Sequence, residues 1–137
     1  MSISNNNGSI DPETAGLSGL RILVVEDSWN VGVAMKRLLQ ALGASVAGPV
    51  ATTADAERLI SEQMPDVSLV DFSLRNGELA HGLIEKLNRH GVPVIVVSGY
   101  KDLPLQPGTV ALALQKPVLA NQLLAALRSL TADKATR

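Results

Sequence analysis

The sequence predicts a single α/β domain, in which a doubly wound, five-stranded parallel sheet lies between helices. Five short apolar runs alternate with segments whose apolar residues recur every three or four positions. Runs such as "PVIVV" show no polar alternation, which is typical of strands that are buried on both faces of a parallel sheet. The length of 137 residues suits one domain, and right-handed crossovers are expected between its strands.

The predicted strands also indicate the order of the sheet. They span residues 21–25, 45–51, 67–70, 92–97 and 110–114. Pro49 lies in the second strand, and because proline cannot donate to a ladder, this strand is expected at an edge. The flavodoxin-like order 2-1-3-4-5 places the second strand there. Ligands of such sheets bind beyond the carboxyl ends of the strands, so functional side chains are expected at those ends.

The first two helices have clear start and stop signals. One begins after Ser28 with a 3.6-residue apolar period, and Gly43 supplies its stop. The next begins at Thr53, carries acidic residues in its first turn and ends before Pro65. These two helices connect the first three strands.

The remaining helices differ in strength. The third closes at Gly91 and carries His81 and His90, both expected on the solvated surface away from the strand ends. A weak fourth helix is expected in "KDLPLQPGT", because its two prolines disfavour helical structure. The last helix spans about residues 119–130, with one apolar face turned inward.

The two ends of the chain are polar. Residues 1–18 are rich in Gly, Asn and Ser and are expected to be disordered, the folded domain spans 19–130, and 131–137 form a flexible tail. The N-terminus lacks the pattern of a signal peptide, and no run approaches the about 20 apolar residues of a membrane span. The chain has no cysteine, which excludes disulfides and suits a reducing compartment. A cytoplasmic location without membrane contact is therefore expected.

The charge balance argues against nucleic-acid binding. The chain has 12 basic and 13 acidic residues, a formal charge of −1 and 2% aromatic residues. No basic stripe is available to contact phosphates, and there are too few aromatic rings to stack on bases. Nucleic acids are therefore not expected among the partners.

Polar side chains follow four of the five predicted strands. Glu26 and Asp27 end the first, Asp71 the third, Ser98 the fourth and Lys116 the fifth. Each alone has an ordinary structural explanation as a helix cap or loop residue. Together, three carboxylates at one sheet edge require a counter-ion, and Mg²⁺ suits them because it uses few carboxylates and keeps waters and phosphate oxygens. The hydroxyl and the ammonium group suit a phosphate.

On these residues the chain resembles a response-regulator receiver domain of two-component signalling, over about residues 19–130. The matching segments are "VVED", "VDFSL", "VSG" and "QKP". The resemblance implies that Asp71 accepts a phosphoryl group from a histidine kinase or a histidine phosphotransfer protein. It also implies that Asp27 and Asp71 bind Mg²⁺ directly, Glu26 through water and Ser73 through its carbonyl.

The same resemblance implies a switch. Lys116 would bridge to the phosphoryl oxygens, and Ser98 would move to hydrogen-bond the phosphate. The family's aromatic switch position, three residues before the lysine, is Ala113 here. Tyr100 stands two residues after Ser98 in "SGY", which resembles single-domain receivers with a Thr-Gly-Tyr run, so Tyr100 is the expected aromatic switch. A downstream protein is expected to bind residues 99–109, strand five and the last helix.

Two other functions are compatible with such a fold. One is a receiver-fold module that binds partners without being phosphorylated. The other, an aspartyl-phosphate phosphatase, requires a second aspartate two residues after a nucleophile on strand one, where Ser28 and Trp29 follow Asp27. A flavodoxin requires a Ser/Thr-rich phosphate loop there, and the acidic pair would repel the phosphate. A phosphoacceptor signalling domain, rather than an enzyme, is therefore the function predicted.

Overall fold

The computed structural model describes residues 16–74, 80–99 and 108–135 of the chain. Five parallel strands form one sheet in the order β2-β1-β3-β4-β5, which confirms the predicted order and the edge position of the strand that contains Pro49. The strands are β1 (Arg21–Val25), β2 (Ser45–Val50), β3 (Val67–Asp71), β4 (Val94–Ser98) and β5 (Leu112–Gln115). The helices described are α2 (Trp29–Ala41), α3 (Thr53–Glu62), α4 (His81–Arg89) and α5 (Ala120–Ala135).

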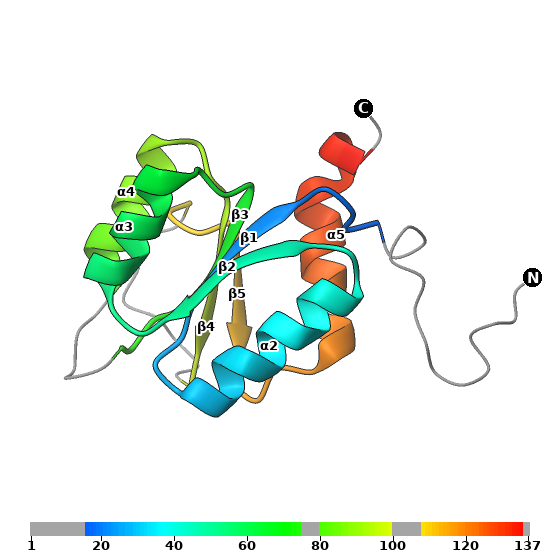
Figure 1. The fold of residues 1–137 in the computed structure, drawn as a ribbon, viewed down its shortest axis with the longest axis horizontal. Helices are drawn as coiled ribbons and strands as arrows, with labels where there is room; N and C mark the ends of the chain where they lie inside the picture. The colour runs from blue at the N-terminus through cyan, green and yellow to red at the C-terminus, as the bar shows by residue number, and fades with distance from the viewer. Residues whose placement is uncertain (1–15, 75–79, 100–107, 136–137) are drawn as a thin grey trace, which may run out of the picture.

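The helices cover the sheet from both sides. Figure 1 shows α3 and α4 together on one face of the sheet and α2 and α5 on the other. Each layer closes its own apolar core, and the strands supply side chains to both cores. β3 and β4 are buried along their full length, as expected for inner strands of a parallel sheet. Among the described residues, no helix has the length and apolar character needed to cross a membrane.

Several element bounds differ from the prediction. β4 begins at Val94 rather than residue 92, because the amide of Val92 donates to the carbonyl of Leu87 and so closes α4. α5 continues to Ala135, because residues 131–135 include neither glycine nor proline to stop it. At the other end, Leu17 is fully buried in the α2–α5 core, so the packed part of the chain begins before residue 19. The expected weak fourth helix falls largely on residues 100–107, which lie outside the described residues.

β2 contains a bulge beside β1. Leu23 pairs with Ala47 and Val25 pairs with Val50, so β2 has one residue more than β1 between these pairs. Gly48 takes a positive φ of 97° there, and a Cβ at this position would lie 2.6 Å from the carbonyl oxygen of Val24. Glycine is therefore required at the bulge, because any side chain would collide with the backbone of β1.

Candidate functional site at the carboxyl ends of the strands

The structure brings the predicted polar residues to one edge of the sheet. Asp71 is the last residue of β3 and Ser98 the last residue of β4, while Glu26 directly follows β1. Lys116 directly follows β5, and its amide donates to the carbonyl of Ser98 at 2.8 Å. Because the strands are parallel and in register, their carboxyl ends lie side by side.

Three carboxylates form a cluster at this edge. Glu26, Asp27 and Asp71 each offer a carboxylate oxygen, and these oxygens lie within 4.8 Å of one another. Glu26 and Asp71 are only 4% and 3% exposed, whereas Asp27 is half-buried. Carboxylates so close together, with little water between them, repel one another strongly. The cluster therefore favours a bound cation.

Lys116 supplies one positive charge to the cluster. Its Nζ donates to Oδ2 of Asp71 at 2.9 Å and lies 3.8 Å from Oε1 of Glu26. Burial lowers the pKa of Lys116, but the hydrogen bond to Asp71 and the nearby carboxylates outweigh this effect and raise the pKa above its ordinary value. Lys116 therefore stays charged. One ammonium group cannot balance three carboxylates, so a negative excess remains.

Glu26 responds to this environment by holding its proton more tightly. Burial raises the pKa of Glu26 to about 7, although a hydrogen bond from the amide of Ser28 acts in the opposite direction. The negative charge of Asp71 raises the pKa further. Near neutral pH the Glu26 carboxyl is consequently protonated for part of the time. A cation bound beside it would displace that proton.

Backbone amides orient two of the carboxylates. The amide of Ser28 donates to Oε2 of Glu26 at 3.0 Å, and the amide of Ser73 donates to Oδ1 of Asp71 at 3.1 Å. Each bond spans two residues, the local pattern by which acidic side chains stabilise turns. The sequence did not reveal these amides as part of the site. The sequence signal that could have indicated them is an acidic residue followed two positions later by serine, which occurs at both places.

Other predicted residues lie at different depths around the site. Ser98 is 2% exposed, and Trp29 at the start of α2 is 70% exposed. Tyr100 lies outside the described residues. His81 is exposed as expected, but the prediction that it lies away from the strand ends is wrong. Its ring packs edge-on against Phe72, the residue after β3, with ring centroids 5.0 Å apart.

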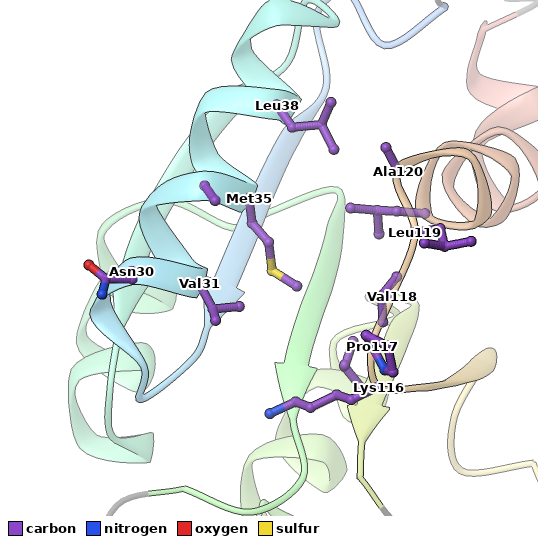
Figure 2. Close-up of a pocket in the computed structure, with 12 residues that line it drawn as sticks. Asn30, Val31, Met35, Leu38, Lys116, Pro117, Val118, Leu119 and Ala120 are labelled. Carbon is purple, nitrogen blue, oxygen red and sulfur yellow. The ribbon is translucent and has the colours of Figure 1, made fainter.

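A groove that sequence reasoning missed borders the site. It lies between α2 and the segment that joins β5 to α5, and its volume is about 680 Å³ (Figure 2). Val31 on one wall and Leu119 on the other are 42% and 59% exposed, although both are apolar. Lys116 lies at the boundary: its side chain extends from the groove toward the end of β3 (Figure 2). The lining residues are Asn30, Val31, Ala34, Met35, Leu38, Val97, Lys116, Pro117, Val118, Leu119, Ala120 and Leu123.

Comparison with known proteins supports the fold independently. No family model and no curated protein sequence matches the chain. Among solved structures, the CheY-like response regulator receiver domain from Methylobacillus flagellatus is 26% identical over 81% of this chain and 98% of its own, with a TM-score of 0.72. The receiver (REC) domain of the response regulator PhyR from Erythrobacter litoralis is 21% identical over 84% of this chain and 92% of its own, with a TM-score of 0.73.

A longer neighbour is also similar. The anti-anti-sigma factor PhyR from Bartonella quintana is 18% identical over 85% of this chain, with a TM-score of 0.74. The chain spans 49% of that protein's length. The solved structures therefore establish that this chain has the fold of response regulator receiver domains, with five parallel strands in the order 2-1-3-4-5.

Proposed function

We propose that this chain is a signalling domain whose Asp71 accepts a phosphoryl group. The observation that carries the proposal is the position of the Asp71 carboxylate, which is buried, accepts a hydrogen bond from Lys116 and lies close to the carboxylates of Glu26 and Asp27. The donor is a phosphohistidine of a histidine kinase or a histidine phosphotransfer protein. The solved receiver-domain neighbours support this choice of reaction.

The donor set fits Mg²⁺. Carboxylate oxygens are its preferred protein ligands, and the cluster carries more negative charge than Lys116 balances. Asp27 and Asp71 would hold the ion directly, Glu26 through water and Ser73 through its carbonyl oxygen. Bound there, Mg²⁺ would offset the charge repulsion between a carboxylate and a phosphoryl group.

In the reaction, a carboxylate oxygen of Asp71 attacks phosphorus and forms an O–P bond. The P–N bond to the donor histidine breaks, and its electron pair returns to the imidazole. Lys116 faces Asp71 at 2.9 Å and stabilises the negative charge on the transferred oxygens. No general base is needed, because the attacking carboxylate has no proton to lose.

The output is a rearrangement around the new charge. Phosphorylation converts the carboxylate of Asp71 into an acyl phosphate, which carries nearly two negative charges and three acceptor oxygens. Lys116 moves from Asp71 to the phosphoryl oxygens, and Ser98 turns to hydrogen-bond them. Tyr100 moves together with Ser98. A downstream protein binds the surface formed by residues 99–109, β5 and α5 and so detects the change.

The groove beside Lys116 provides a surface for the donor. Its walls are mostly apolar, and Lys116, which lies at its boundary, contacts Asp71 of the acidic cluster. An amphipathic helix that carries the phosphohistidine fits such a groove, with its apolar face on Val31 and Leu119. This placement would bring the phosphoryl group to the open edge of the sheet.

A second candidate is a receiver-fold module that binds its partner without phosphorylation. The likeness to an anti-anti-sigma factor favours it, because that name describes an action on another protein rather than a phosphotransfer. Such a module would bind its partner equally well whether or not Asp71 is phosphorylated. A phosphatase would instead release phosphate continuously from a small phosphorylated substrate.

The test is incubation with acetyl phosphate and Mg²⁺, followed by intact mass measurement. The wild-type chain should gain one phosphoryl group only when Mg²⁺ is present, and Asp71→Asn should gain none. Asp66→Asn is the matched control, because Asp66 lies at the opposite end of β3 and accepts a hydrogen bond from the amide of Arg21. A gain of mass in Asp71→Asn, or none in the wild type, would overturn the proposal.

A further inference from the structure

The first turn of α2 touches the bulge of β2 at an unusually close contact. Gly32 is buried in α2, and a Cβ at this position would lie 2.7 Å from Cβ and 3.0 Å from Cγ of Pro49. Real Cβ atoms essentially never lie within 3.0 Å of such a neighbouring heavy atom. Only glycine therefore allows the helix to lie this close to the bulge.

The bulge is also packed closely against β1. Gly48 places Pro49 beside α2, and the backbone of Gly48 is itself packed against the carbonyl oxygen of Val24 in β1. A helix interior normally disfavours glycine, because its backbone loses more freedom there than that of any other residue. The presence of glycine at position 32 is thus explained by Pro49, which leaves no room for a Cβ there.

The same contact borders the acidic pair. The amide of Glu26 donates to the carbonyl of Val50, at the end of the bulged strand, at 2.8 Å. The amide of Gly32 donates to the carbonyl of Ser28 at 2.9 Å, and the amide of Ser28 donates to the carboxylate of Glu26 at 3.0 Å. The loop of residues 26–28 is therefore held from both sides, by the bulge and by the first turn of α2.

We propose that Gly32 and Pro49 are positioning residues that set the placement of Glu26 and Asp27 relative to Asp71, and with it the affinity of the site for Mg²⁺. The inference rests on the proposed function, which identifies the cluster as the Mg²⁺ site. A Cβ at position 32 would lie 2.7 Å from Pro49, so α2 and the bulge must separate until this distance reaches at least the 3.4 Å of ordinary van der Waals packing. Mg²⁺ demands near-ideal octahedral geometry, so a displacement of the loop that carries Asp27, a direct ligand, and Glu26, which binds through water, weakens binding.

The first measurement compares Mg²⁺ binding and stability in one substituted chain. Gly32→Ala should weaken Mg²⁺ binding at least tenfold in a calorimetric titration, while urea unfolding reports whether the domain stays folded. Gly82→Ala is the matched control, because Gly82 lies in the first turn of α4 and a Cβ there would meet no atom within 4 Å. Gly82→Ala should leave Mg²⁺ affinity unchanged.

A double-substitution cycle tests whether Pro49 is the cause. In a chain that carries Pro49→Gly, which removes both contacting carbons, adding Gly32→Ala should lower the Mg²⁺ affinity less than threefold. In the presence of Pro49→Ala, which keeps Cβ, the tenfold loss should remain. Unchanged Mg²⁺ affinity in Gly32→Ala, or an equal loss with and without Pro49→Gly, would overturn the proposal.

Two further outcomes also decide it. If Gly32→Ala does not fold, the double substitution with Pro49→Gly should fold and bind Mg²⁺, and its failure to fold would overturn the role of Pro49. If the wild-type chain itself does not bind Mg²⁺, the proposed function fails together with this inference. If the wild type binds Mg²⁺ and is phosphorylated while Gly32→Ala does both equally well, only this inference fails.

Discussion

The starts of α2 and α3 differ, although each helix follows a strand of the same sheet. In α3, the hydroxyl of Thr52 accepts a hydrogen bond from the amide of Asp55 at 3.1 Å, and Asp55 places an acidic side chain in the first turn. In α2, Ser28 occupies the same position but makes no side-chain cap, and the first turn contains no acidic residue. The amide of Ser28 instead orients Glu26.

The exposed surfaces of the two helices differ in the same way. Charged side chains of α3 form ion pairs, among them Glu57 with Lys86 of α4 at 3.0 Å. The corresponding surface of α2 presents Trp29 and Val31, which are 70% and 42% exposed. The start of α3 thus shows the usual means of stabilising a helix. The start of α2 lacks them: there the amide of Ser28 binds Glu26, and Val31 lines the groove.

The largest difference between the two helix starts should appear in the pH dependence of stability. The pKa of Glu26 is about 7 in the folded chain, against an ordinary value of 4.5, so between pH 5 and 7 the folded state binds more protons than the unfolded state. The free energy of unfolding should therefore fall as the pH rises through this window, by on the order of 2 kcal/mol. Urea unfolding in the absence of Mg²⁺ measures it.

Two glutamine substitutions locate this effect. Glu26→Gln should flatten the pH dependence, because it removes the carboxyl that titrates. Glu57→Gln on α3 should leave the slope in place, since the Glu57 side chain is 46% exposed. An identical slope in both variants would contradict the assignment of this effect to the start of α2.

The next effect concerns the groove. Val31→Asp should slow phosphotransfer from a histidine phosphotransfer protein at least tenfold, because a buried charge would oppose docking of an apolar helix face. Phosphorylation by acetyl phosphate should persist, since this small donor needs no groove. Ala54→Asp, at an exposed position near the start of α3, is the matched control and should change neither rate. Equal slowing by both substitutions would exclude the groove as the donor surface.

The smallest effect concerns the caps themselves. Thr52→Ala should lower the free energy of unfolding by about 1 kcal/mol, because it leaves the amide of Asp55 without its partner. Ser28→Ala should change it by less than about 0.5 kcal/mol, because the Ser28 hydroxyl makes no cap. Denaturant midpoints measured for both variants at one pH make the comparison. If Ser28→Ala lowered the free energy of unfolding as much as Thr52→Ala does, both helix starts would depend on the side chain of their cap residue, and the comparison would be wrong.

The sheet and the position of the site could be predicted from the sequence, because both depend on local patterns. Unbroken apolar runs indicated parallel strands, and Pro49 indicated which strand lies at an edge. Polar residues that directly follow such strands must converge, since parallel strands end at the same side of the sheet. The proximity of Glu26, Asp27 and Asp71 follows from that rule.

The remaining features depend on contacts between segments that are distant in sequence. Nothing local indicates that Gly32 meets Pro49, although a glycine inside a helical pattern is a signal that some neighbour is close. The groove arises from the spacing between α2 and the segment that joins β5 to α5, which an apolar period does not specify. Leu17 is likewise buried by partners in α2 and α5, whereas its own polar neighbours in sequence indicated disorder.

The bulge of β2 also affects whether two copies of this chain can associate through their sheet edges. β2 lies at the edge of the sheet, where exposed amides and carbonyls invite a strand from another chain to add to the ladder. Pro49 has no amide hydrogen to offer, and the extra residue beside it breaks the even spacing that an incoming strand requires. The bulge at Gly48 and Pro49, which brings β2 against α2, therefore also disfavours aggregation by strand addition at this edge when the protein is concentrated.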